Sequence, residues 1–267
     1  MKRLAFVLLF VAGSCSGIFE DREDCPSRIW FDLVEDRGLL HDERIAYVVQ
    51  NVSGVREAAG ETILEDMDRD HEISIRKGLV RAFGAVGAGT LWSADGLYRI
   101  PEGDECGELY RFLSDVEVRE EICRIPVRLE KEFCTIDICL HFATDGPAAP
   151  YSVGIRSGWC GCSLSEVRAL EGNFNVLARE DGEGHFLCRV PRQGDDGMMM
   201  DLYPKDGPAE GEPSESIRIG RIISGLEGFS WEDESLQDIS LEFDFTKGLV
   251  TISVNGWDVV RKFNVTI

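Results

Sequence analysis

Alternation of apolar and polar residues is the feature that most restricts the fold of this 267-residue chain. Successive side chains of a β-strand point to opposite faces, so a period of two indicates strands that bury one face only. The alternating segments are short, rich in Val, Ile and Phe, and bounded by turn-forming residues. A short helix is expected only at Val52–Met67. Strands are expected at 28–34, 44–49, 72–76, 127–142, 151–155, 185–190, 198–203, 216–223, 239–245, 249–254 and 259–267.

These strands predict an all-β fold of packed antiparallel sheets. The clearest hairpin joins 239–245 to 249–254, and Gly248 between them can adopt a positive φ. A strand that buries one face must pack against a second sheet, and a chain of this length favours two β-sandwiches over one. We therefore predict an N-terminal β-sandwich over 28–126 and a C-terminal β-sandwich over 127–267.

The first residues predict a lipoprotein leader. Lys2 and Arg3 precede a short apolar run over 4–12, and small residues lead to Cys15. This order is typical of an export signal, and the run is too short to span a bilayer. We predict that residues 1–14 are a signal peptide and that Cys15 receives a lipid at the start of a tether over 15–27. Cleavage nearby, with Cys15 left free or in a disulfide, is the alternative.

Charge restricts the partners. The chain has 49 acidic and 28 basic residues and a net charge of −21, which repels phosphate backbones, so we expect no nucleic-acid partner. Several of the acidic residues lie within 16–24, directly after Cys15. In lipoproteins of Bacteroidales an acidic stretch at this place resembles an outer-surface export signal, and a solvated tether is the simpler alternative.

Eight cysteines remain when Cys15 is set aside. An even number in an exported protein indicates disulfides or buried thiols, and the sequence does not choose among the pairings. Their spacing fits no zinc-binding pattern, and four histidines are few for a metal site, so we expect no metal. The eight are Cys25, Cys106, Cys123, Cys134, Cys139, Cys160, Cys162 and Cys188.

Two segments have the composition of a nucleotide-binding loop and of a calcium-binding loop, but neither has the residue pattern that such a loop needs. The glycines of 84–89 lack the order and context of a dinucleotide loop, and we expect a flexible loop there. Residues 66–70 alternate carboxylates as a calcium loop does at its start. His71 and Lys77 stand where that loop needs glycine and glutamate, so a solvated acidic turn is expected.

Catalysis by Cys160 or Cys162 would require a histidine base. The candidates in the same half of the chain are His141 and His185, and both lie in strand patterns where a structural role is expected. No pair of carboxylates stands out by its spacing. We therefore expect that the protein is not an enzyme and that it binds no cofactor.

Three blocks of sequence resemble the FimB-type fimbrial anchor lipoproteins of Bacteroidales. The first is 18–26, after the predicted lipidation site, and the second combines 170–174 with 190–193. The third comprises 228–231, 236–239, 244–245 and 254–257. The likeness covers the leader and most of 127–267, whereas 40–125 match only in strand rhythm. The number of cysteines departs from the family pattern.

The resemblance implies two transthyretin-like, Greek-key β-sandwiches in a lipid-anchored protein of the outer membrane. Such a protein would seat the base of a fimbria, limit its length, and engage a fimbrial stalk subunit by β-strand complementation. The alternative is a surface lipoprotein that binds carbohydrate or a host ligand, with Trp159, Trp231 or Trp257 stacked on sugar rings. For Trp231 and Trp257, packing in the core or at a sheet edge is the expectation from the hairpin they flank.

Overall fold

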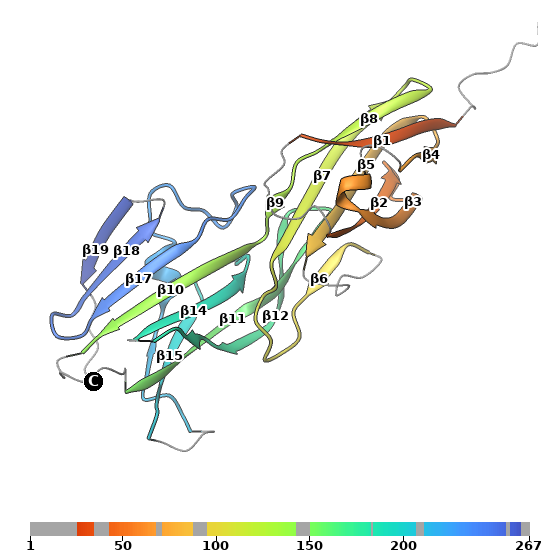
Figure 1. The fold of residues 1–267 in the computed structure, drawn as a ribbon. Coiled ribbons are helices and arrows are strands. Elements are labelled where there is room, and N and C mark those ends of the chain that lie inside the picture. The colour runs from red at the N-terminus through yellow and green to blue at the C-terminus, as the bar shows by residue number, and fades with distance from the viewer. Residues whose placement is uncertain are drawn as a thin grey trace, which may run out of the picture.

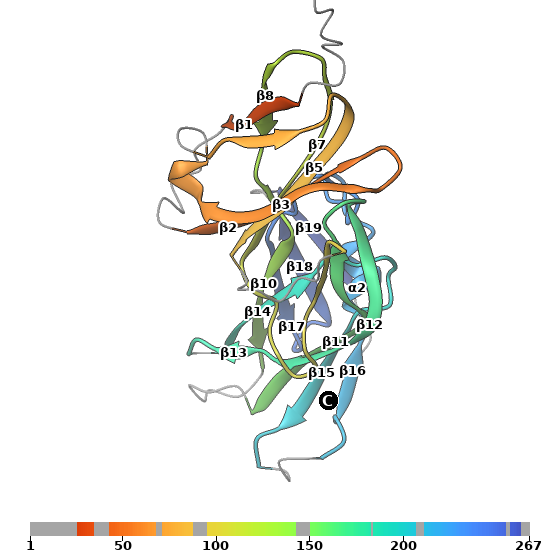
Figure 2. The same ribbon diagram turned by 90° about the vertical axis from the view of Figure 1, so that its right-hand side faces the viewer.

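The computed structural model describes residues 26–34, 43–67, 71–87, 95–142, 150–182, 184–206, 211–254 and 257–262. Strands dominate, so the predicted all-β class is confirmed. Figure 1 shows two bodies side by side, and the turned view of Figure 2 separates them again. The elements are β1 (Ser27–Leu33), β2 (Arg44–Asn51), β3 (Arg56–Ile63), β4 (Ile73–Ile75), β5 (Gly78–Gly87), β6 (Leu97–Arg99), β7 (Leu109–Val118), β8 (Ile122–Val127), β9 (Glu130–Lys131), β10 (Phe133–His141), β11 (Tyr151–Ser163), β12 (Arg168–Leu177), β13 (Arg179–Glu180), β14 (His185–Pro191), β15 (Met199–Pro204), β16 (Glu215–Ile217), α2 (Ile219–Ile223), β17 (Ile239–Asp244), β18 (Leu249–Val254) and β19 (Trp257–Lys262).

The N-terminal body is a sandwich of two sheets. One sheet has the order β4-β1-β8, and the other has the order β3-β2-β5-β7-β9. Phe31 on β1 joins them, because its ring lies 5.2 Å from that of Tyr47 and 5.5 Å from that of Phe112. Pairing is antiparallel except between β1 and β8, which run parallel.

The C-terminal body is a larger sandwich. Its first sheet has the order β13-β14-β10-β17-β18-β19, and its second has the order β12-β11-β15-β16. Here β10 and β17 are the parallel pair. Strand β6 comes from the N-terminal half of the sequence, yet it pairs with β11. The buried apolar residues of both bodies form one continuous cluster, so the sandwiches are packed together.

The predicted boundary between the sandwiches, near residue 127, falls at the end of β8 and ahead of β9 and β10. Strand β9 pairs with β7 of the first body, whereas β10 pairs with β14 and β17 of the second. The division between residues 126 and 127 stays a prediction. Strand β6 precedes this boundary in the sequence but pairs with β11 of the second sandwich, whereas β9 follows the boundary but pairs with β7 of the first.

Three expected local structures are wrong. The helix expected over 52–67 is replaced by β3 and a 3₁₀ turn at Leu64–Asp66, because pairing with β2 overrides helix propensity. The loop expected at 84–89 is a strand as far as Gly87, and Gly84 lets β5 approach Ala46 and Phe112 too closely for a side chain. The strand expected at 216–223 ends at Ile217, and α2 follows.

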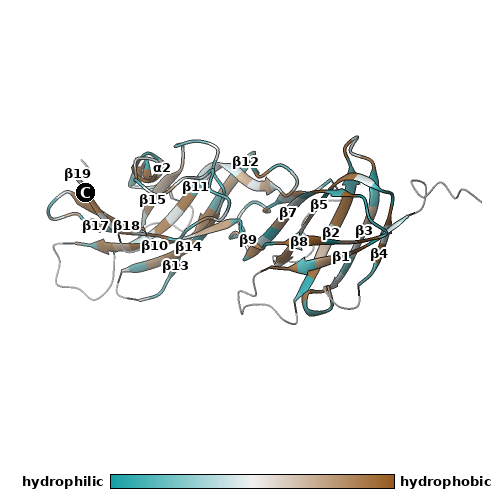
Figure 3. Ribbon diagram, turned by 90° about the horizontal axis from the view of Figure 1, so that it is seen from above, coloured by the Kyte–Doolittle hydropathy of each residue, from teal (hydrophilic) through white to brown (hydrophobic). Residues whose placement is uncertain are grey.

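The predicted hairpin is confirmed. Strands β17 and β18 pair antiparallel from Asp244 opposite Leu249, and Gly248 has a φ of 62°. The Asp244 carboxylate closes the turn by accepting hydrogen bonds from the backbone N–H groups of Thr246 and Lys247, at 3.0 and 3.1 Å. Hydrophobic and hydrophilic residues alternate along many strands in Figure 3, as the period of two requires.

Candidate functional site

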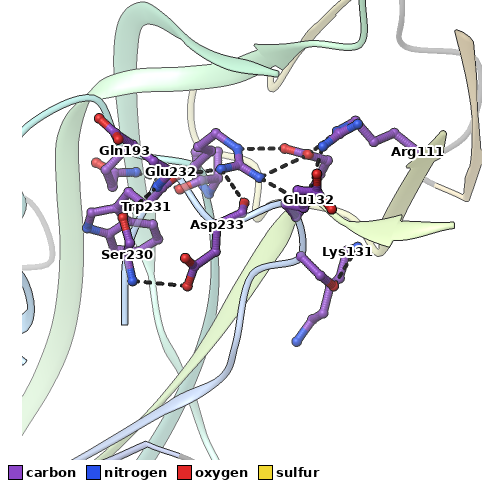
Figure 4. Close-up of polar contacts among 12 residues, drawn as sticks. Arg111, Lys131, Glu132, Gln193, Ser230, Trp231, Glu232 and Asp233 are labelled. Carbon is purple, nitrogen blue, oxygen red and sulfur yellow. Dashed lines mark hydrogen bonds and ion pairs between the residues drawn. The ribbon is translucent and has the colours of Figure 1, made fainter. Parts of the chain in front are cut away.

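A buried ion network lies where the two sandwiches meet. Arg111 belongs to β7, Glu132 stands between β9 and β10, and Arg192 follows β14 directly. Their side chains are at most 3% exposed. Glu132 accepts hydrogen bonds from Arg192 through both carboxylate oxygens, at 2.9 and 3.0 Å, and a further one from Arg111 Nε. Figure 4 shows Glu132 between Arg111 and the loop that contains Trp231.

Backbone carbonyls complete this network, since one carboxylate cannot satisfy two guanidinium groups. Arg192 Nη1 donates to the carbonyl oxygen of Trp231 and to that of Asp233, the latter at 2.8 Å. Arg111 Nη2 donates to the carbonyl oxygen of Glu234 at 3.2 Å. The network therefore joins the first sandwich to the second and fixes the loop 231–234 across the junction.

The same loop is fixed again next to β10. The Leu236 N–H donates to the Lys131 carbonyl oxygen at 2.9 Å, and the Lys131 N–H donates to Ser235 Oγ at 3.2 Å. Asp238 accepts the Thr135 N–H at 2.6 Å. The segment from α2 to β17 is thus held to the junction by both its backbone and its side chains.

A cavity of about 580 Å³ lies beside Arg192. Its wall is formed by the start of β12, by the segment after β14 and by the loop after α2. Arg168, Asp195, Asp196 and Glu232 give it a mixed-charge lining with an excess of carboxylates. The residues that line it are 167–169, 192–196, Ser224 and 229–232.

Two residues of the cavity wall, Gln193 and Trp231, each contain a buried polar atom without a partner in the described chain. In the described residues, Gln193 Oε1, Trp231 Nε1 and Trp159 Nε1 are buried and make no hydrogen bond. Gln193 and Trp231 line the cavity, with residues 3% and 8% exposed. The Trp159 ring lies against Gly194, which leaves no room for a Cβ at that lining position. Gln193 Nε2 donates to the Pro191 carbonyl oxygen at 2.7 Å, which fixes the orientation of the amide.

Backbone strain occurs at the same place. Val167, another lining residue, has a φ of 53° and is the one non-glycine residue with a positive φ in the described part of the chain. A β-branched residue in this region is a strained exception and marks a position over-determined by its surroundings. The wall of the cavity therefore contains both buried polar atoms without a hydrogen-bond partner and a strained backbone position at Val167.

The structure gives the surroundings of seven of the predicted cysteine positions, while Cys15 and Cys25 lie outside the described residues. All seven are free thiols, and the partly buried ones are Cys123 and Cys139. Burial raises the pKa of Cys106 to about 12 and raises the pKa of Cys162 as well. A thiol held in its neutral form is a poor nucleophile. The fully buried ones are Cys106, Cys134, Cys160, Cys162 and Cys188.

The predicted histidines are brought together, but not around Cys160 or Cys162. His141 Nε2 and His185 Nε2 each lie 3.5 Å from the sulfur of Cys139, on the partly exposed face of β10 and β14. His141 also contacts a Glu242 oxygen at 2.9 Å. Burial raises the pKa of Cys139. No group of three or more His, Cys, Asp or Glu in the described chain is arranged to hold a metal ion.

The predicted acidic turn at 66–70 and the two predicted tryptophans lie in different parts of the structure. Asp66 lies in the 3₁₀ turn, while residues 68–70 are outside the described chain. Trp231 is buried as expected, and its ring packs nearly perpendicular to that of Phe229 with the ring centroids 4.9 Å apart. Nothing of the Trp257 side chain is described.

Two of the blocks singled out by sequence meet at this site. Residues 190–193 supply Arg192 and Gln193, residues 228–231 supply the facing wall, and 236–239 anchor the loop to β10. The block 170–174 lies in β12, where Gly172 leaves room for the Cys160 sulfur. The sequence does not reveal Arg111 and Glu132 as buried, because a charged residue in an alternating strand is ordinarily exposed.

Comparison with known proteins finds likeness in structure only. No family model matches the chain, and no curated protein matches it. The fimbrial anchor protein Mfa2 of Porphyromonas gingivalis superposes with a TM-score of 0.61 at 11% identity, over 88% of this chain and 99% of Mfa2. A candidate polysaccharide-binding protein of Bacteroides thetaiotaomicron gives 0.64 at 12% identity, over 90% and 99%.

A fimbrial assembly protein of Parabacteroides distasonis gives a TM-score of 0.50 at 10% identity, over 88% of this chain and 99% of its own. No helix in the described residues is long and apolar enough to cross a membrane. The chain has the fold of fimbrial and adhesin proteins of Bacteroidales over nearly its whole length.

Proposed function

We propose that this protein is a non-enzymatic, lipid-anchored subunit at the base of a fimbria, which engages a stalk subunit by strand complementation and limits fimbrial length. The observation that carries the proposal is the shared fold with the anchor protein Mfa2, which spans both sandwiches and leaves almost none of Mfa2 unmatched. Likeness to a fimbrial assembly protein supports the same role.

The junction suits a protein that transmits force. A base subunit is pulled between its membrane anchor and the stalk, so its domains must not separate. The continuous core and the buried network of Arg111, Glu132 and Arg192 hold the two sandwiches as one unit. Under this proposal the lipid on Cys15 and the tether over 15–27 would carry the load to the outer membrane.

Open sheet edges provide the surface for a partner strand. Among the described residues, strands β3, β12 and β19 each pair with one neighbouring strand only, so each presents an open sheet edge there. Each carries or adjoins an exposed apolar residue, namely Ile63, Leu177 and Val260. A strand added at such an edge gains main-chain hydrogen bonds and buries alternate side chains.

The first test is isolation of the protein with its partners. Gentle detergent extraction of the source organism and pull-down on this protein should recover a polymer of stalk subunits that resists salt, because main-chain pairing is screened little by ions. The Cys15→Ser variant should leave the membrane fraction. Recovery of the lipidated protein alone, or release of the polymer by modest salt, would contradict the proposal.

The edge can be identified with matched variants. Ile63→Lys, Leu177→Lys and Val260→Lys each place a charge at an exposed position on a different open edge. One of them should lower capture of the stalk subunit at least about tenfold, while the other two serve as its controls. Equal capture by all three variants would show that these edges do not receive the partner strand.

A further inference from the structure

Side chains that can bind a metal meet on the partly exposed face of the C-terminal sandwich, and we propose that they bind a Zn²⁺ ion. Strands β14, β10 and β17 are neighbours in the first sheet of this sandwich (Figure 1). Cys139 of β10 lies opposite His185 of β14 and opposite Glu242 of β17. His141 and Asp137 are each two residues from Cys139 on β10, so they share its face. This inference does not rest on the fimbrial proposal.

The donor atoms have the spacing of ligands on one ion. Cys139 Sγ lies 3.5 Å from His141 Nε2 and 3.5 Å from His185 Nε2. His141 Nε2 also lies 2.9 Å from Glu242 Oε1. Zinc binds sulfur at about 2.3 Å and imidazole nitrogen at about 2.0–2.1 Å, which places these two donors about 3.5 Å apart on a tetrahedral ion. Thiolate and imidazole together select zinc over the hard cations, which prefer oxygen ligands.

Asp137 is in the place of the outer partner that a metal-binding histidine usually has. The second ring nitrogen of His185, Nδ1, lies 3.6 Å from Asp137 Oδ1. This oxygen is buried and has no hydrogen-bond partner in the described chain. A histidine that binds a metal through Nε2 carries its proton on Nδ1 and donates it to such a carboxylate. Zinc binding would therefore fix the tautomer of His185, and a small rotation of the ring would give the buried oxygen a partner.

The charges around the thiol favour a cation. Burial and the carboxylates of Glu242 and Asp137 raise the pKa of the Cys139 thiol. A bound metal ion reverses this effect, because it stabilises the thiolate and neutralises the carboxylates. The thiol proton is released to solvent on binding, and no electron is transferred. The net charge of the whole chain, −21, also attracts a cation to this surface.

Small side-chain rotations would complete the site. In the described chain, no group of three such side chains already surrounds a common point. The two histidines and the two carboxylates are each about half exposed, so they are free to rotate around an ion. The backbone needs no change, since the pairing of the three strands fixes where each side chain begins. Because the donors come from three strands, closely spaced sequence patterns do not reveal them.

The test is a titration of the full chain with Zn²⁺, and with Co²⁺ as a spectroscopic substitute. Calorimetry should show that a single Zn²⁺ ion binds at micromolar concentration and releases a proton. Bound Co²⁺ should give the visible bands of a tetrahedral ion and a thiolate-to-cobalt charge-transfer band. Zn²⁺ should also raise the urea concentration at which the chain unfolds, because the folded chain alone presents the assembled ligands.

Variants assign the ion to these side chains. Cys139→Ser and His185→Gln each remove a ligand and should weaken Zn²⁺ binding at least about a hundredfold, and Cys139→Ser should abolish the charge-transfer band. Asp137→Asn changes the outer partner and should weaken binding about tenfold. Cys123→Ser is the matched control, because Cys123 is the other partly buried thiol of the described chain and lies on β8 of the first sandwich. It should bind Zn²⁺ as the natural protein does.

Absence of Zn²⁺ binding at micromolar concentration would overturn the inference. Equal affinity in Cys139→Ser and the natural protein would overturn it as well. Displacement of Zn²⁺ by millimolar Ca²⁺ would also contradict it, because the carboxylates alone would then form the site. Urea unfolding of the metal-free variants should match that of the natural protein, since the replaced side chains are partly exposed. His185→Gln decides the question if Cys139→Ser does not fold.

Discussion

The buried polar groups on the two sides of Arg192 differ in whether they are hydrogen-bonded. On the side of Glu132, the guanidinium groups of Arg111 and Arg192 donate hydrogen bonds to the Glu132 carboxylate and to carbonyl oxygens of residues 231–234. On the side of the cavity, Gln193 Oε1 and Trp231 Nε1 are equally buried and have no partner in the described chain. The two environments are adjacent in space and are built from overlapping segments.

This difference separates polar groups that stabilise the fold from polar groups that do not. A satisfied buried network rigidifies a fold, and removal of one member leaves an uncompensated charge. Buried polar atoms without a partner add nothing to stability, because no hydrogen bond compensates for their loss of contact with water. Substitutions in the network around Glu132 should therefore lower the free energy of unfolding strongly, whereas substitutions of the unpaired groups in the cavity wall should change it little.

The largest effect is expected for Glu132→Gln. It removes the one carboxylate between the buried Arg111 and Arg192, so the free energy of unfolding should fall by about 3–5 kcal/mol. Urea unfolding of the purified protein measures the change. Glu166→Gln is the control, because Glu166 pairs with Arg168 at an exposed site and should cost at most about 1 kcal/mol. Equal losses in both variants would contradict a stabilising junction.

A gain in stability is expected for Val167→Gly. Glycine accepts the positive φ that strains valine, although it also increases the entropy of the unfolded chain, and the net gain should be up to about 1 kcal/mol. Asn175→Gly, at an exposed position in the interior of β12, should instead lose stability. Urea unfolding compares the two. A loss in Val167→Gly would mean that its backbone is not strained.

A near-neutral effect is expected for Gln193→Met. The change removes the hydrogen bond to Pro191, worth about 1 kcal/mol, but it also relieves the buried oxygen that has no partner. The free energy of unfolding should therefore change by less than about 1 kcal/mol. A loss as large as that of Glu132→Gln would show that the cavity wall is as closed as the junction.

The local sequence pattern predicts those parts of the fold that depend on local pattern alone. Alternation identified the all-β class and the hairpin of β17 and β18, because each strand buries one face there. It failed over 56–63, where alanines and glutamates favour a helix and pairing with β2 decides otherwise. It also failed at Gly84, because the close approach of β2 and Phe112 is a tertiary contact.

The candidate site was only partly predictable. The blocks 190–193 and 228–231 were singled out as family-like, but nothing in their sequence indicates that they face each other across a cavity. Arg111 and Glu132 carry no local signal, since their burial depends on one another and on Arg192. Chain topology brings these three residues together from β7, from the residue between β9 and β10 and from the residue that follows β14.

The smallest effect is expected at an exposed polar cluster, the turn of the β17–β18 hairpin. Hydrogen bonds from Lys247 and Thr246 lower the pKa of Asp244 to about 2, from an ordinary value of 3.8. Because the folded-state pKa is the lower one, the stabilisation is complete above the ordinary value and is lost as the pH falls from about 4 to about 2.

Asp244→Asn removes this titration. The natural protein should unfold at a slightly higher urea concentration than the variant at about pH 6, and most of the difference should be lost at about pH 2. Urea midpoints at the two pH values measure it. Solvent screens this cluster, so its effect should be far below that of Glu132, although both carboxylates accept several hydrogen bonds. A difference that persists at low pH would assign the effect to the shape of the turn and not to the charge of Asp244.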